Sequence, residues 1–255
     1  MRDLLIRVVD TVSVLVGREL RIRYKGSFFG ILWALLSPLG AVLVIRFVFT
    51  KILTIGIPHF SIFLYSAFLP WVWFQSTVQT GATALADNRD LVRTPFFPKP
   101  LLPCIVTCSN FLLYLFALPV LLGLMVADGV PLTSALIALP VIWIVQGLLT
   151  LGVTMVIAAV GVLVRDVQHL MGVVLVLWFY LTPVFYELNQ VPPDSVRWFS
   201  LNPMTAVVSA HRAVTLYGRF PNWIELGYWT LGGIFLLLVS LLVFRTLEDA
   251  FIEET

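Results

Sequence analysis

Long apolar runs, separated by short islands of charge, are the feature of this sequence that most constrains its fold. A helix that crosses the hydrocarbon core of a bilayer needs about 20 consecutive apolar residues, and the chain supplies roughly six such runs. Only 12% of its 255 residues are charged, too few for the surface of a water-soluble fold. We therefore expect an all-α integral membrane protein, with one transmembrane domain over residues 1–255.

Six transmembrane helices are expected, joined by loops too short to form a separate soluble domain. The expected spans are residues 31–50, 60–80, 102–126, 135–163, 170–186 and 226–245. The first 30 residues carry too many charges for a cleavable signal peptide.

The distribution of basic residues predicts the orientation. With the N-terminus in the cytoplasm, 11 of the 16 Lys and Arg residues lie inside: Arg2, Arg7, Arg18, Arg21, Arg23, Lys25, Arg89, Arg93, Lys99, Arg165 and Arg245. The other five lie outside or in the first span: Arg46, Lys51, Arg197, Arg212 and Arg219. The positive-inside rule thus favours both termini in the cytoplasm.

Residues 1–25 have the pattern of an amphipathic helix before the first span. Its polar stripe follows the helical period through Asp3, Arg7, Asp10, Arg18, Arg21 and Lys25. A basic amphipathic helix at this position favours the plane of the membrane interface, and the alternative is an arm packed on its own protein. We expect its last basic residues to help admit an anionic lipid head group: Arg18, Arg21, Arg23 and Lys25.

The loop between the second and third expected spans contains a short helix at residues 87–95. Asp87 suits the N-cap, Asp90 suits the first turn, and Pro95 ends the helix. Apolar residues beside it make it either a docking element or a helix that packs on its neighbours. The expected contact residues are Asp87, Asn88, Arg89, Asp90, Leu91, Val92 and Arg93.

Residues 182–220, between the fifth and sixth expected spans, depart from the span-and-loop pattern. Asn202-Pro203 pairs an N-cap residue with a proline at the first helical position, and Gly218 suits the other end of the helix. The helix between them is too short to span a bilayer and suits a re-entrant segment over a wet pathway.

We expect this outer segment to be a gate, with Pro183 and Pro192-Pro193 as rigid turns. Arg212 is expected on the helix surface, either near an exit or as a satisfied interfacial arginine. The expected gate residues are Pro183, Tyr186, Asn202, Pro203 and Arg212.

Aromatic residues gather near the ends of the expected spans. One interpretation is the aromatic belt of the membrane interface, and the other is a channel in which flat rings contact the apolar faces of sugars. The candidate channel residues are Trp33, Trp71, Trp73, Phe74, Trp178 and Tyr180.

Motifs for nucleotide binding and for hydrolysis are absent from the sequence. The histidines His59, His169 and His211 are widely separated and do not form a metal-ligand pattern. Cys104 and Cys108 form a CxxxC pair without a histidine, which favours packing over metal binding. No catalytic residue, metal site or bound cofactor is expected on this chain.

Asp87 and Asp90 are the one acidic pair that could serve an enzyme. In membrane-embedded prenyl-transferring enzymes, aspartates at such spacing hold magnesium against a diphosphate. Those enzymes need a second acidic motif, and the only other acid in an expected cytoplasmic loop, Asp166, suits an ion pair with Arg165. This enzyme class is the less favoured alternative.

An ordered set of short motifs runs from about residue 15 to 225. In chain order they are Arg18–Tyr24, Leu32-Trp33, Pro38, Asp87–Pro103, Arg165–Val167, Thr182–Tyr186, Val191-Pro192, Leu201–Pro203 and Arg212. In this set the chain resembles the permease subunits of ABC-2-type polysaccharide and polyol-phosphate exporters, which include O-antigen, capsule and teichoic acid transporters. An ABC-2 permease for a small amphipathic molecule, such as a drug or haem, has the same topology and stays open as an alternative.

The resemblance implies a homodimer bound to two copies of a separate ATPase, which would hold ATP and magnesium. Residues 87–93 would form the coupling helix, and residues 182–218 would form the outward gate. The substrate would be a lipid-linked glycan, often on undecaprenyl diphosphate, moved across the bacterial inner or plasma membrane.

Overall fold

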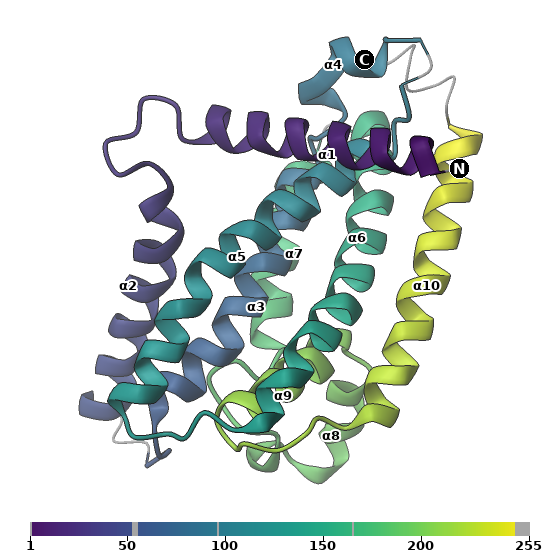
Figure 1. Ribbon diagram of the computed structural model, residues 1–255. Coiled ribbons are helices and arrows are strands. Elements are labelled where there is room, and N and C mark those ends of the chain that lie inside the picture. The colour runs from purple at the N-terminus through teal and green to yellow at the C-terminus, as the bar shows by residue number, and fades with distance from the viewer. Residues whose placement is uncertain (1, 53–55, 96, 165, 248–255) are drawn as a thin grey trace.

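The computed structural model describes residues 2–52, 56–95, 97–164 and 166–247, with side chains from residue 10 onward. Within these residues the chain forms only helices, as expected, and no strand (Figure 1). The α-helices are α1 (Arg2–Arg23), α2 (Trp33–Phe47), α3 (Phe60–Gly81), α4 (Arg89–Val92), α5 (Leu101–Ala127), α6 (Leu139–Leu163), α7 (Val167–Tyr180), α8 (Pro193–Ser200), α9 (Pro203–Thr215) and α10 (Trp223–Thr246).

Four helical segments of the described chain are long and apolar enough to cross a membrane. They match four of the expected spans: Gly30–Ile52 around α2, Leu101–Ala127, Ser134–Leu163 and Trp223–Thr246. The expected span at residues 60–80 forms α3, which is not one of the four. Polar and amphipathic side chains such as Tyr65 and Gln75 lower the hydropathy of α3. Because 16 of its 22 residues are buried, α3 needs little lipid-facing surface.

The expected span at residues 170–186 is wrong in its bounds. The helix there, α7, begins at Val167 and ends at Tyr180 after 14 residues, fewer than the roughly 20 that a span needs. Pro183 explains the early end, since a proline disfavours helical geometry in the residue before it, here Thr182. Helix length and apolar composition together therefore support four spans in the described chain.

The functional segments expected on opposite sides of a membrane lie at opposite ends of the helix bundle (Figure 1). The first end, at the top of Figure 1, carries α1, α4 and the last residues of α10. The second end carries α8 and α9. We call these the α1 end and the α9 end.

The helix α1 lies across the bundle at the α1 end (Figure 1). Its Val16 is 6% exposed and belongs to a small apolar cluster with Leu85, Val92 and Leu102. The helix α1 therefore packs on its own protein, and its place in the membrane interface stays a prediction.

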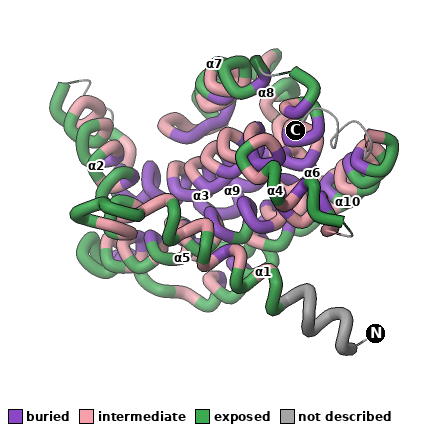
Figure 2. The backbone as a smooth tube through the Cα atoms, turned by 90° about the horizontal axis from the view of Figure 1, so that it is seen from above, coloured by how far each residue is buried: buried purple, intermediate pink, exposed green. Residues whose placement is uncertain are grey.

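The main core surrounds α3 and α9, which occupy the middle of the bundle when it is viewed from the α1 end (Figure 2). The helices α2, α7 and α10 lie on the periphery and expose apolar side chains. Exposed apolar residues on peripheral helices are expected where lipid, rather than water, surrounds the protein.

Candidate functional site

The segment expected to form a coupling helix is a tight 3-10 turn, Ala86–Asn88, followed by the single α-helical turn α4. Asp87 was expected to be the N-cap, but it lies inside the 3-10 turn. Asn88 occupies the N-cap position, and its side chain donates to the Ala84 carbonyl (2.9 Å). The Thr94 hydroxyl donates to the Asp90 carbonyl (2.7 Å) and closes the other end.

The surface of this segment is charged and not apolar. Asp87, Arg89, Asp90 and Arg93 are exposed, whereas Val92 is 1% exposed and packs in the cluster under α1. The expectation that Val92 belongs to an apolar docking surface is wrong, because Val92 anchors the segment to its own subunit. The half-buried Leu91 packs on the same cluster, and Phe96 lies outside the described residues.

The four basic residues expected to admit a head group divide into two kinds. Arg18, Arg21 and Lys25 are exposed on α1 and just after it. Arg23 turns inward, where it donates to the side-chain oxygen of Asn110 on α5 (2.8 Å) and pairs with Glu19 one turn earlier (3.3 Å). Burial raises the pKa of the neighbouring Tyr24 above its ordinary value, although Arg23 acts in the opposite direction.

Three of the six expected channel aromatics are core residues. Trp71, Trp73 and Phe74 are at most 3% exposed, and the ring of Trp71 packs against Phe74 and Phe179. The expectation that these three line an open channel is wrong for the subunit, because α3 occupies its middle.

The other three channel candidates reach the surface of the subunit. Trp33 and Tyr180 are exposed, and Trp178 is half-buried. They remain candidates for contact with a substrate.

Asn202 joins the end of α7 to the start of α9. Its side-chain oxygen accepts from the Trp178 indole (2.8 Å) and from the amide of Met204 (3.0 Å), which makes it the expected N-cap of α9. Its side-chain nitrogen donates to the Leu181 carbonyl (3.0 Å) and the Thr182 hydroxyl (2.9 Å). All four hydrogen-bonding positions of the carboxamide are therefore used, which fixes the two elements to each other.

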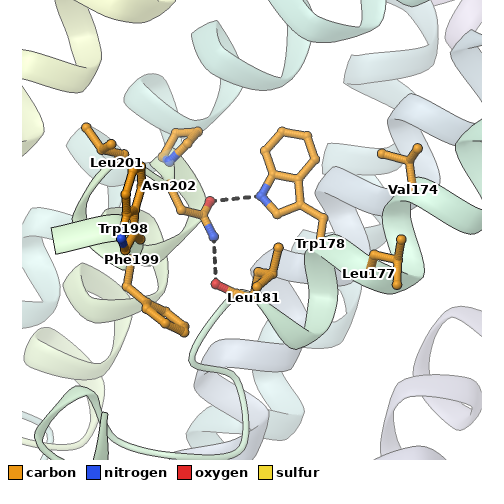
Figure 3. A pocket seen from close by; sticks show the side chains of 9 residues that line it. Val174, Leu177, Trp178, Leu181, Trp198, Phe199, Leu201 and Asn202 are labelled. Carbon is orange, nitrogen blue, oxygen red and sulfur yellow. Dashed lines mark hydrogen bonds between the residues drawn. The ribbon is translucent and has the colours of Figure 1, made fainter. Parts of the chain in front are cut away.

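An apolar cavity of about 470 Å³ lies beside Asn202, between α7 and α8 (Figure 3). Its walls are aliphatic and aromatic side chains from both helices, including Leu177, Leu181 and Trp198. Because the carboxamide of Asn202 is already saturated, this cavity offers little hydrogen bonding.

Arg212 is buried, contrary to its expected place on the surface of the half-helix. Its guanidinium donates to the carbonyls of Phe63 (3.2 Å), Tyr186 (3.3 Å) and Val184, and it stacks 3.5 Å from the centre of the Phe63 ring. The first carbonyl belongs to α3 and the other two to the loop after α7. Arg212 is thus a clamp between the core and the outer segment, and not an exposed ligand for an anion.

The loop that Arg212 holds has further contacts. The Tyr186 hydroxyl donates to the Tyr180 carbonyl (2.9 Å), and the Tyr217 hydroxyl donates to Glu187 (3.0 Å). Burial and the bond to Glu187 raise the pKa of Tyr217, so its hydroxyl stays a donor at neutral pH. Pro183 is buried in a turn of the same loop.

The two helices of the outer segment differ in burial. In α9, 10 of 13 residues are buried, so it is an inner helix of its own subunit. It begins at Pro203 as expected and ends at Thr215, three residues before Gly218, which has a left-handed backbone (φ +60°). In α8, no residue is buried. The pair Pro192-Pro193 is not simply an extended turn, because Pro193 is the first residue of α8.

Comparison with known proteins places this arrangement in a family. The model of the ABC-2 type transporter family matches residues 11–216, well over half of the chain. The chain belongs to this family. The matched region contains residues 87–93 and residues 182–216, which include all of α9.

Several curated proteins resemble this ABC-2 family member along nearly all of its length. It is 36% identical over 241 residues to the O-antigen export system permease protein RfbA of Myxococcus xanthus, covering 94% of this chain and 93% of that protein. It is 26% identical over 245 residues to a Klebsiella pneumoniae protein of the same name, covering 96% of this chain and 94% of that protein. It is 24% identical over 248 residues to the polysialic acid transport protein KpsM of Escherichia coli, covering 94% of both.

A buried hydrogen-bond chain in this ABC-2 family member was not anticipated. The Trp143 indole donates to the Tyr114 hydroxyl (2.9 Å), which lies 3.2 Å from Nε2 of His211, and Nδ1 of His211 lies 2.9 Å from the Val207 carbonyl. Since a carbonyl only accepts, His211 carries its proton on Nδ1 and accepts from Tyr114 through Nε2. The chain joins α5, α6 and α9. Polar residues within apolar runs were the sequence signal for it.

Metal-ligating residues do not gather in the described chain, where no group of three or more His, Cys, Asp or Glu residues could hold a metal ion. His59 and His169 are exposed, near the starts of α3 and α7. Cys104 and Cys108 are free thiols. The expected ion pair of Asp166 lies outside the described residues, because Arg165 is not described.

Arg46 and Lys51, to which the sequence assigned no role, are exposed. Arg46 lies in the last turn of α2, and Lys51 in the π-helical turn Val48–Ile52 that follows. Long basic side chains at the end of a span can reach the membrane surface.

Proposed function

We propose that this chain is the transmembrane permease subunit of an exporter that moves a lipid-linked polysaccharide across the bacterial inner or plasma membrane. The observation that carries the proposal is the 36% identity to an O-antigen export permease over 94% of the chain. The similarity to a polysialic acid transport protein supports the same class of substrate. The permease for a small amphipathic molecule is the alternative that the test below separates.

We further propose that ATP and magnesium bind a separate ATPase, and that two permeases assemble with two ATPases. The chain has no nucleotide-binding motif of its own, which supports a separate energy source. The charged surface of Asp87, Arg89, Asp90 and Arg93 would dock this partner. Through Val92 and the cluster under α1, movement of the docked segment would reach α1 and α5.

The proposed topology has six crossings, with both termini in the cytoplasm. In Figure 1 the helices α2, α3, α5, α6, α7 and α10 run alternately between the two ends, which supports six crossings even though only four are long and apolar enough by themselves. The α1 end would be cytoplasmic, because it carries most of the basic residues.

The proposed outer gate comprises residues 182–220. Asn202 and Arg212 fix this segment to α7 and α3, so it would move together with these helices. The inner helix α9 is covered by its own subunit, so we assign contact with the second subunit or the substrate to the exposed α8.

Reversing the charge of the docking surface is expected to break the complex and leave the permease folded. We predict that Arg89→Glu with Arg93→Glu lowers co-purification of the ATPase at least tenfold, because both side chains are exposed and like or unpaired charges at an interface are costly. Arg219→Glu, exposed at the α9 end and outside α8, is the matched control and should not change the yield of the complex. Unchanged association and export in the double variant would place the docking surface elsewhere.

Deletion of the chain in its native bacterium tests the substrate. We expect loss of the surface polysaccharide and accumulation of lipid-linked glycan on the cytoplasmic side, with recovery when the chain is supplied again. Measurement of surface glycan and of glycan-lipid in membrane extracts reads both effects. Normal surface glycan, together with intracellular retention of a small amphipathic compound, would support the alternative permease instead.

A further inference from the structure

A cavity of about 240 Å³ lies inside the subunit where the end of α1 meets α2, α3 and α5. We propose that this cavity binds the phosphate of a lipid head group, with Arg23 as the phosphate ligand. The proposal concerns a site within one subunit, so it does not depend on the transported substrate.

The floor of the cavity is a buried polar contact. Asn110 is 2% exposed, and its side-chain oxygen accepts from Nη1 of Arg23 (2.8 Å). The side-chain nitrogen of Asn110 donates to the Val106 carbonyl (3.0 Å), which fixes the orientation of the carboxamide. Arg23 is therefore held in the cavity and does not sample the solvent freely, as Arg21 on the exposed face can.

Arg23 keeps donors for a ligand. A guanidinium has five N–H groups, and its bonds to Asn110 and Glu19 use two of them in the part of the chain that the structure describes. Glu19 does not line this cavity, but lines a smaller one beneath α1. A planar guanidinium with spare donors suits a phosphate, which accepts paired hydrogen bonds.

The other polar groups of the cavity are neutral. The hydroxyls of Tyr24, Ser37 and Ser76 line it, and none of the three forms a hydrogen bond with a described residue. No acidic side chain is among the described residues that line it. The lining therefore holds one cation, three unused hydroxyls and no carboxylate, and the carboxylate of Glu19, just outside the lining, pairs with Arg23 (3.3 Å).

The remaining walls indicate that the anion belongs to a lipid. They are apolar side chains of α2, α3 and α5, such as Trp33, Val72 and Leu113, and α2 is a peripheral helix that exposes apolar residues. The cavity lies next to the end of α1, the helix that lies across the bundle at the α1 end. A phosphate could contact Arg23 while the attached chains follow the apolar walls. A membrane phospholipid and a phosphorylated polyprenyl carrier share this chemistry.

Native mass spectrometry of the delipidated permease tests the proposal. The probes are phosphatidylglycerol, undecaprenyl phosphate, diacylglycerol, which lacks the phosphate, and inorganic phosphate. We expect one tightly bound lipid phosphate per subunit, no comparable binding of diacylglycerol, and at least tenfold weaker binding in Arg23→Gln, because a charge-assisted contact is lost. The matched control Arg219→Gln removes the same charge from an exposed position at the α9 end and should change binding less than twofold.

A second variant leaves the charge in place. Ser37→Leu adds apolar volume to the cavity from α2 and should also weaken binding at least tenfold, even if Arg23→Gln fails to fold. If only phosphatidylglycerol binds tightly, the ligand is a membrane phospholipid. If only undecaprenyl phosphate binds tightly, the ligand is a carrier lipid. Equal losses in Arg23→Gln and Arg219→Gln, undiminished binding in Ser37→Leu, or full competition by inorganic phosphate would overturn the proposal.

Discussion

Arg212→Leu is expected to destabilise the outer segment and to abolish export. The substitution removes the donors to three carbonyls, of which those of Phe63 and Val184 are buried and that of Tyr186 is half-buried. Hydrogen bonds from a charged donor contribute about 1.5–3 kcal/mol each, and buried acceptors left without a donor add a penalty. We expect a loss of at least about 3 kcal/mol in local stability, measured by hydrogen exchange of residues 182–217.

The matched control for this variant is Arg219→Leu. Arg219 lies four residues after the end of α9 and is exposed, so removing its charge should leave hydrogen exchange and export nearly unchanged. Arg212→Lys, which keeps the charge but cannot contact three carbonyls in the same geometry, should have an intermediate effect. If Arg212→Leu and Arg219→Leu behave alike, Arg212 is not the clamp that its contacts indicate.

Gly161→Ala is expected to separate two helices of the bundle. A Cβ atom at Gly161 on α6 would overlap the carbonyl oxygen of Ala82, at the end of α3. A backbone atom cannot turn aside as a side chain can, so α6 and α3 would have to move apart. Small residues allow such close approach between membrane helices. We expect a loss of about 1–3 kcal/mol or more, measured by thermal unfolding in detergent.

Gly123→Ala is the control for the effect of the residue type itself. Gly123 also lies within a long helix, α5, but a Cβ atom there would meet nothing within 4 Å. Since alanine favours a helix over glycine by about 1 kcal/mol, this variant should be neutral or slightly stabilised. A Gly161→Ala protein as stable as Gly123→Ala would contradict the close contact between α6 and α3.

Local chemistry made part of the outer segment predictable from the sequence. The N-cap Asn202, the proline at the first position of α9 and the left-handed Gly218 follow rules that involve only a few neighbouring residues. The amphipathic α1 and the four long apolar helices were predictable for the same reason, because periodicity and length are read along the chain.

Residues whose role depends on tertiary contacts were placed less well. Arg212 seemed a surface residue because arginine is rarely buried, but three carbonyls from distant segments surround it. The residues next to Trp71 in the sequence suggested a channel, and those next to Val92 suggested a docking surface. Their burial depends on α3 lying in the middle of the bundle and on α1 lying across its end, which no short motif encodes.

The most direct test is translocation by the reconstituted complex. The permease, with the ATPase that co-purifies with it, is placed in proteoliposomes with a labelled lipid-linked glycan, and glycan reaching the opposite leaflet is measured with and without ATP. We expect ATP-dependent translocation that disappears when this chain is omitted or carries Arg89→Glu with Arg93→Glu. Failure of a fully assembled, ATP-hydrolysing complex to move the glycan, while it moves a small amphipathic compound, would contradict polysaccharide export.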